Sequence, residues 1–247
     1  NIFHEYLLIV KPDTIFINCS YSILHQALIY SAKKQMIHTI ELQHGVVSKI
    51  NSAYLPSQNI CQKTYPEYFL SFGKGEKSRI SSNFINKKNI HPMGNYYLEK
   101  MKNIKREKKV VMYFELLYKK YEKLITISSQ ETIEEELFFF IKEVSYLLPK
   151  VGFIFVPRQY QLFSLQKDLS ENMILNHEID LYTNTQFSDF HSSVYSSFSN
   201  EALFFETPNI MINIKGIANA YFSELFQDNL LVKFVDTPKE YAFTIEN

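Results

Sequence analysis

Residues 191–214 read HSSVYSSFSNEALFFETPNIMINI, and this stretch decides the fold class of the second half of the chain. Small hydroxyl side chains mark a strand-to-helix junction, a short apolar helix follows, and a proline separates that helix from a run of branched aliphatic residues. Strands that alternate with helices in this way predict a parallel sheet in an α/β fold.

The same alternation is present near the N-terminus. TIFINC at 14–19 predicts a strand, YSILHQALIYSAKKQ at 21–35 a helix, and MIHTIELQHG at 36–45 a second strand that ends at a glycine. PEYFLSFG at 66–73 and KNIHPMGN at 88–95 repeat the strand pattern. The simplest architecture is therefore two consecutive Rossmann-like domains.

The charged stretch YLEKMKNIKREKK at 97–109 has no wide apolar stripe and predicts the domain boundary. We assign residues 1–103 to the first domain and 104–247 to the second. In the second domain KVVMYFEL at 109–116 predicts a strand, residues 131–150 a long amphipathic helix, and GFIFVPRQY at 152–160 another strand.

Composition excludes several classes of protein. Lys and Arg together number 26, as do Asp and Glu, so no basic field favours nucleic acid as a partner. Two cysteines outside any metal-binding pattern fit a reducing cytoplasm. No apolar run is long enough to cross a bilayer, and the first residues lack an initiating Met and a signal peptide, so we expect the chain to begin inside a longer protein.

The junction at 191–201 is the first candidate site. Hydroxyl side chains at the start of a helix can bind a diphosphate, and a carboxylate one turn further on can accept hydrogen bonds from a ribose. The alternative is that the serines only cap the helix and the glutamate faces solvent. The candidate donor-binding residues of this stretch are His191, Ser192, Ser193, Ser196, Ser197 and Glu201.

Two further candidates follow predicted strands. His44, in ELQHG, lies at the carboxyl end of a parallel strand, where ligands bind in such sheets, and it is a candidate general base that Glu41 could tune. Arg158 could bind a phosphate. A structural histidine and an exposed arginine are the alternatives. No dinucleotide, P-loop, hydrolase or zinc-protease motif is present, and no residues suggest a metal site.

Taken in order, these motifs resemble those of bacterial glycosyltransferases with two Rossmann-like domains, the GT-B class, especially enzymes of capsule and surface-polysaccharide synthesis. The resemblance rests on QHG at 43–45, YPEYFLSFG at 65–73, MGN at 93–95, KKVVMYFE at 108–115 and the stretch at 191–214. It implies that the serine motif contacts a nucleotide-sugar and that His44 lies near the reacting centre. It also implies an incomplete N-terminal domain, because the usual first strand and helix of such enzymes are not visible before the linker. VPRQYQ at 156–161 departs from the histidine-proline pair of many relatives, so Arg158 replaces that phosphate contact or the site is altered.

The resemblance implies sugar transfer from a nucleotide-sugar to a growing capsule or lipopolysaccharide glycan, in a cleft between facing domains, without a metal or other cofactor. The acceptor is expected to be a glycan or lipid-linked glycan, and the location the cytoplasm, with peripheral association at the inner membrane face. Two alternatives stay open at this point: a nucleotide-sugar epimerase of the same fold, and a non-catalytic glycan- or nucleotide-binding partner in a polysaccharide-assembly complex.

Overall fold

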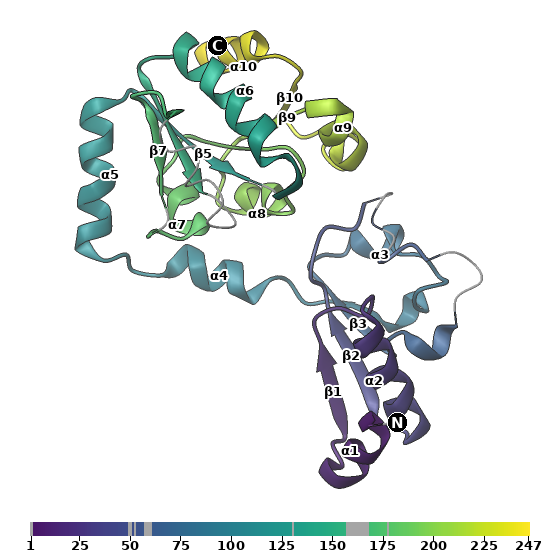
Figure 1. Ribbon diagram of the computed structural model, residues 1–247. Helices are drawn as coiled ribbons and strands as arrows, with labels where there is room; N and C mark the ends of the chain where they lie inside the picture. Colours follow the sequence, from purple (N-terminus) through teal and green to yellow (C-terminus); the bar gives the residue numbers. More distant parts are fainter. Residues whose placement is uncertain are drawn as a thin grey trace. The chain divides into compact units, whose positions relative to one another are not determined.

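The computed structural model describes residues 2–48, 51, 53–56, 61–129, 131–156, 168–176 and 178–247. The chain divides into two compact units, Asn1–Tyr96 and Tyr97–Asn247 (Figure 1). Each unit contains its own parallel sheet with helices packed on it, which confirms the predicted α/β class with two Rossmann-like domains.

The first unit is built on a four-stranded sheet in the order β1-β2-β3-β4, with every neighbouring pair parallel. Its elements are α1 (Ile2–Val10), β1 (Thr14–Ile17), α2 (Ile23–Lys34), β2 (His38–Leu42), η1 (Gln62–Thr64), β3 (Tyr68–Ser71), α3 (Glu76–Arg79), η2 (Lys87–Asn89) and β4 (Ile90–Pro92). Helix α2 begins at Ser22, whose side chain accepts a hydrogen bond from the His25 amide and caps the helix.

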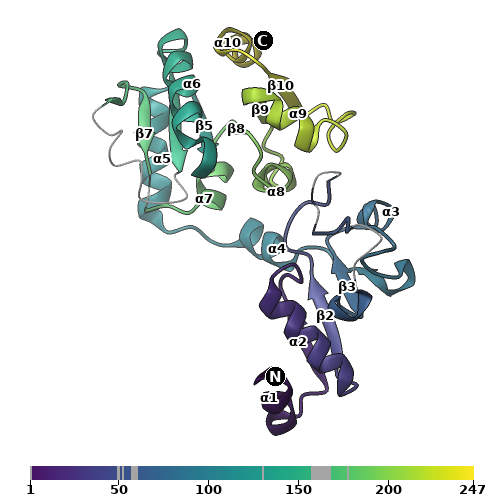
Figure 2. The ribbon, with the colours of Figure 1, turned by 45° about the vertical axis from the view of Figure 1, so that its right-hand side comes forward.

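One face of this sheet is well covered. Leu7 of α1 and Ala32 of α2 pack with Ile15 of β1, and Figures 1 and 2 show both helices beside the β1–β2 half of the sheet. The same face at β3 and β4 is covered by an aromatic cluster in which Tyr54 and Phe84 surround Phe69. The core of the first unit therefore lies on one side of its sheet.

The opposite face of the first sheet, which we call the open face, carries the alternate residues of each strand. Phe16 and Leu42 on this face are 61% and 42% exposed, whereas Ile17 and Phe69 on the covered face are 5% and 0% exposed. Parallel sheets are normally covered on both faces. Among the described residues of the first unit, no helix packs over the open face in the way that α1 and α2 pack over the other.

The second unit has a six-stranded parallel sheet in the order β10-β9-β8-β5-β6-β7. Its elements are α4 (Tyr96–Asn103), α5 (Lys108–Lys120), β5 (Lys123–Ser128), η3 (Glu131–Ile133), α6 (Glu134–Leu147), β6 (Val151–Val156), β7 (Met173–Leu175), α7 (Leu181–Gln186), β8 (Phe190–Ser193), α8 (Phe198–Phe204), β9 (Asn209–Ile212), η5 (Ile214–Gly216), α9 (Ile217–Phe222), β10 (Val232–Val235) and α10 (Pro238–Glu246).

Both faces of this second sheet are covered. Leu137 of α6 and Tyr241 of α10 pack with Phe153 and the other inward residues of the central strands on one face. Phe114 of α5 packs with Leu124 on the other face and stacks on Phe187, with ring centroids 4.5 Å apart. Full coverage on both sides is the normal state of a doubly wound parallel sheet.

The sequence prediction of a strand at 109–116 was wrong. These residues form α5, because Val110, Phe114 and Leu117 recur at helical spacing and pack on the sheet. Met112 and Leu116, on the outer side, are 50% and 61% exposed. The strand of this region is β5, the next apolar run along the chain.

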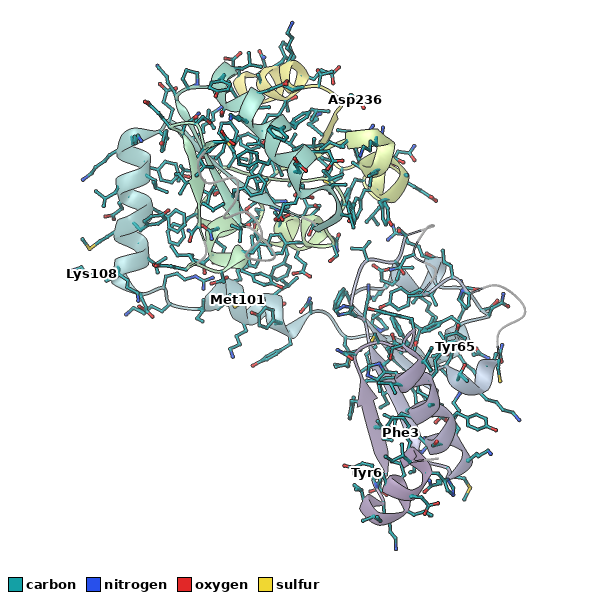
Figure 3. All side chains as sticks on the ribbon, in the orientation of Figure 1. Phe3, Tyr6, Tyr65, Met101, Lys108 and Asp236 are labelled. Carbon is teal, nitrogen blue, oxygen red and sulfur yellow. The ribbon has the colours of Figure 1, made fainter. Side chains whose placement is uncertain are left out.

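The segment that follows Tyr96 belongs to the second unit. Leu98 and Met101 of α4 are buried (Met101 is labelled in Figure 3), and the Tyr97 ring packs on that of Tyr182 at 5.2 Å. The Gln186 side chain and the Arg106 guanidinium both donate to the Met101 carbonyl oxygen, at 3.1 and 3.2 Å. Residues 97–103, assigned to the first domain from their charge, are thus held on the second.

Candidate functional site

In the first unit, the loop after β2 is held by two buried side chains. Gln43 is 5% exposed; its Nε2 donates to the Gly45 carbonyl at 2.8 Å, and its Oε1 accepts the Phe72 amide at 2.7 Å. The hydroxyl of Tyr54 accepts the backbone N–H of His44 at 3.1 Å. The loop Gln43–Gly45 therefore has a fixed backbone at the carboxyl end of the sheet.

His44 is exposed and lines a pocket of about 340 Å³ that lies wholly within the first unit. The pocket is lined by Tyr21, His44, Gly45, Asn51, Ala53, Tyr54 and Tyr65. Among these described residues, His44 carries the single imidazole, and none carries a carboxylate. The described lining of the pocket therefore offers one imidazole among hydroxyl and amide groups.

Glu41 lies on β2 and is 0% exposed. No described residue forms a hydrogen bond with either carboxyl oxygen, and none joins Glu41 to His44. Burial raises the pKa of Glu41 to about 7; the neighbouring Ser20 hydroxyl and amide oppose the shift without reaching hydrogen-bond geometry. Burial raises the pKa of the pocket residues Tyr21, Tyr54 and Tyr65, and the charge of Glu41 adds to this rise.

In the second unit the strand order reverses at β5, which pairs with β6 on one side and with β8 on the other. Ligands of doubly wound sheets bind outside the carboxyl ends of the strands at such a switch point. Ser128 is the last residue of β5, Ser129 follows it, and Tyr195 follows β8. The Tyr195 hydroxyl bonds to that of Thr132 at 2.5 Å, and its ring packs on Tyr221 at 5.4 Å.

The predicted serine motif lies at this edge, although its first two hydroxyls point inward. Ser192 and Ser193 end β8, are 0% exposed, and bond to the hydroxyls of Tyr241 and Ser199 at 2.6 and 2.7 Å. Ser196 is buried and accepts the Phe198 amide at 3.2 Å, whereas Ser197 is exposed at the start of α8. That the motif binds a nucleotide stays a prediction.

His191, at 0% exposure, forms the centre of a buried network. Asn209 donates through Nδ2 to the Ser199 carbonyl, so its Oδ1 accepts from His191 Nδ1–H at 2.6 Å, and Nε2 accepts from the Ser128 hydroxyl at 2.9 Å. Burial lowers the pKa of His191 to about 4, and Asn209 opposes part of that shift. The ring is a neutral connector between β5, β8 and β9.

Glu201 lies on α8 and is half-buried. Its Oε2 accepts a hydrogen bond from the Tyr182 hydroxyl at 2.7 Å. Burial raises the pKa of Tyr182, and the Glu201 carboxylate adds to this rise. The predicted contact of Glu201 with a ribose stays a prediction.

Arg158 lies outside the described residues. Across the described ranges, no three His, Cys, Asp or Glu side chains are grouped to hold a metal ion. In the same ranges, no helix has the length and apolar character needed to span a bilayer.

Sequence reasoning missed the residues that support the site, above all Tyr54, Gln43 and Ser128. Gln43 stands inside the quoted QHG motif, so its position was a usable signal. Tyr54 lies ten residues beyond His44, in a stretch without strand or helix periodicity. Its role depends on the return of the loop, which the sequence pattern does not reveal.

Comparison with known proteins gave structural likeness only. No family model matches the chain, and no curated protein matches it significantly. The fold is similar to that of Methanocaldococcus jannaschii UDP-GlcNAc 2-epimerase in complex with UDP-GlcNAc and UDP, with 13% identity, a TM-score of 0.70, and coverage of 99% of this chain and 71% of that one. Further UDP-GlcNAc 2-epimerases are among the similar structures.

Two transferase-type structures are also similar. The wall teichoic acid polymerase TagF, soaked with CDPG, has 14% identity and a TM-score of 0.63 over 95% of this chain and 62% of that one. A glycosyltransferase from Rickettsia africae has 15% identity and a TM-score of 0.60 over 99% and 68%. At these identities the likeness establishes the fold: two Rossmann-like domains of the GT-B type.

Proposed function

We propose that this chain is a metal-independent glycosyltransferase that moves a sugar from a nucleotide-sugar to a growing bacterial surface glycan, of a capsule or lipopolysaccharide. The fold is shared with nucleotide-sugar epimerases and with a glycosyltransferase, which supports the substrate class. The observation that carries the choice of reaction is the pocket of the first unit, where one imidazole lies among hydroxyl and amide groups and no described lining residue is a carboxylate.

Transfer to a hydroxyl with inversion needs one base, and His44, which lines the pocket, would remove the acceptor proton. An epimerase must remove and return a proton at carbon and needs acid and base groups in contact with the sugar. The aromatic walls of the pocket suit a sugar ring, whose apolar face packs on tyrosine while its hydroxyls form hydrogen bonds. We assign the acceptor to this pocket.

The donor belongs at the switch point of the second unit, beside Ser128, Ser196 and Ser197. Backbone amides and hydroxyls at the carboxyl ends of β5 and β8 would stabilise the charge that develops on the leaving diphosphate, so catalysis would be mainly electrostatic. UDP is the first nucleotide to test, because several similar structures contain it or its sugar derivatives. We propose that the reaction takes place in the cytoplasm, at the inner membrane face where lipid-linked acceptors reside.

The buried carboxyl of Glu41 favours an epimerase as the second candidate function. Burial raises its pKa to about 7, so this carboxyl can both give and take a proton near neutral pH, and its charge adds to the rise that burial causes in the pKa of the pocket tyrosines. Against this role, it is 0% exposed and does not line the pocket.

The first experiment is titration calorimetry of the chain with UDP, CDP, GDP and CMP. We expect one nucleotide to bind, and Glu201→Gln to weaken that binding, whereas Glu206→Gln, an exposed carboxylate two residues beyond the end of α8, should not. Absence of binding to every nucleotide by the folded protein would refute the donor assignment.

The second experiment follows UDP-GlcNAc by NMR with and without a panel of oligosaccharides. A glycosyltransferase consumes donor and releases UDP in an acceptor-dependent manner, and His44→Gln should reduce this by at least about a hundredfold, within the range for loss of a general base. His91→Gln, on the open face, is the matched control. Conversion of the sugar without acceptor would establish the epimerase instead, and nucleotide binding without turnover would indicate a non-catalytic partner.

A further inference from the structure

Tyr54 is a tyrosine whose ring is fixed in the core of the first unit. It is 2% exposed, and its ring packs edge-on against Phe69 and Phe84, with centroids 5.4 and 5.6 Å away. Edge-to-face aromatic pairs of this kind have a defined geometry and stabilise the fold beyond the burial of the rings. The hydroxyl is therefore held at one place in the pocket wall.

The Tyr54 oxygen fixes the backbone beside the imidazole. It accepts the His44 N–H at 3.1 Å. Burial raises the pKa of this hydroxyl, and the backbone amides of His44 and Gly45 both oppose part of that larger rise. Removal of this hydroxyl would leave the His44 amide without its protein acceptor and would therefore favour a different loop conformation. Asn51 closes the loop that returns Tyr54 to this position, since its Nδ2 donates to the Val46 carbonyl at 2.9 Å.

The proton of the Tyr54 hydroxyl has no acceptor among the described residues. The oxygen is used by the backbone of the loop, so the remaining capacity of the group is to donate. Burial raises the pKa of Tyr54 and keeps the hydroxyl protonated near neutral pH. Tyr54 lines the same pocket as His44, and a ligand in that pocket can accept the proton.

We infer that Tyr54 is a positioning residue of this site: its oxygen fixes the His44 backbone and thereby the imidazole, while its O–H donates a hydrogen bond to an oxygen of the acceptor sugar. The second half of this inference rests on the proposed function, whereas the first half does not. Tyr54 would thus couple the position of the base to the presence of a hydroxylated ligand.

The anchoring is tested without any assay of activity. The protein has seven histidines, so labelling with 15N-histidine gives few backbone signals, and His44→Gln identifies the one of interest. In Tyr54→Phe we expect the His44 amide signal to shift and its hydrogen exchange to accelerate at least tenfold. Tyr68→Phe, on the open face of the same sheet, is the control and should leave both unchanged. Unchanged exchange in Tyr54→Phe would overturn the inference.

The kinetic test uses the full chain and the same variants. We expect Tyr54→Phe to lower kcat at least tenfold and raise the acceptor KM severalfold, with the nucleotide-sugar KM within twofold of the parent. A lower melting temperature of Tyr54→Phe with an unchanged kcat would show that Tyr54 has a structural role only, and it would overturn the inference.

The anchoring by Tyr54 and the proposed sugar transfer can be tested independently. If Tyr54→Phe does not fold, Asn51→Ala leaves the aromatic core intact and should accelerate His44 amide exchange in the same direction; unchanged exchange there counts against the anchoring. If the parent transfers no sugar, the proposed function fails, while the amide-exchange result still decides whether Tyr54 fixes the loop.

Discussion

The buried histidine of the second unit predicts a loss of stability in acid. His191 has an ordinary pKa of 6.5 and a folded-state pKa of about 4, lowered by burial. As pH falls below 6.5, the unfolded chain binds the proton and the folded chain does not. Protonation of His191 therefore does not affect the free energy of unfolding above pH 7, and it lowers that free energy as pH falls from 6.5 to 4.

The magnitude follows from the two pKa values. At pH 5.5 about ten of eleven unfolded chains are protonated, which lowers the free energy of unfolding by about 1.4 kcal/mol relative to pH 7.5; by pH 4 the loss is about 3 kcal/mol. No charged residue contributes to the shift of His191, so this pH dependence depends little on salt.

Chemical denaturation of the parent and of His191→Gln between pH 7.5 and 4.5 measures the effect. The variant should be less stable at every pH, because it breaks the bonds to Ser128 and Asn209. The difference between the two proteins should shrink by about 1.4 kcal/mol from pH 7.5 to 5.5, since all other titrating groups cancel. A difference that stays constant across this range would refute the buried neutral histidine.

Two further predictions concern stability. Glu41→Gln should stabilise the first unit above pH 7. The folded-state pKa of Glu41, about 7, lies above the ordinary 4.5, so this carboxyl destabilises the fold as pH rises from 4.5 through 7, by about 3 kcal/mol in full. Equal gains in the free energy of unfolding at pH 4 and pH 8 would contradict this sign. Gly152→Ala should destabilise the second unit by about 1–3 kcal/mol through overpacking, because a Cβ there would lie 2.7 Å from Tyr121 and 2.8 Å from Leu124. Gly73→Ala is the control, since a Cβ at that position meets nothing within 4 Å. Equal melting temperatures of the two variants would show that the contact at Gly152 relaxes at no cost.

The repeated pattern of strand and helix allowed the fold class to be predicted from the sequence. Short apolar runs that stop at a glycine or a proline, such as those ending at Gly73 and before Pro157, are recognisable without a structure. The error at 109–116 arose because Val110 and Val111 favour a strand by composition, while the helical spacing of Val110, Phe114 and Leu117 decides the outcome. Periodicity over the whole segment carried more information than its first residues.

The candidate site was predictable in location more than in detail. His44 follows a parallel strand, and the structure places it in a pocket as that position suggests. The inward direction of Ser192 and Ser193 could not be read from the sequence, because their hydroxyls bond to Tyr241 and Ser199, and Tyr241 lies far along the chain. Hydrogen-bond partners that come from distant segments are set by tertiary packing, which local pattern does not encode.

The open face of the first sheet has a practical consequence for how ligand binding is measured. Fluorescent dyes that report melting bind exposed apolar surface, and Phe16 and Leu42 offer such surface in the folded protein. A dye-based melting curve would therefore start from a high baseline, and a small shift caused by a nucleotide would be obscured. With 17 tyrosines and no tryptophan, the chain is better followed by tyrosine emission or by calorimetry, neither of which depends on dye binding to that surface.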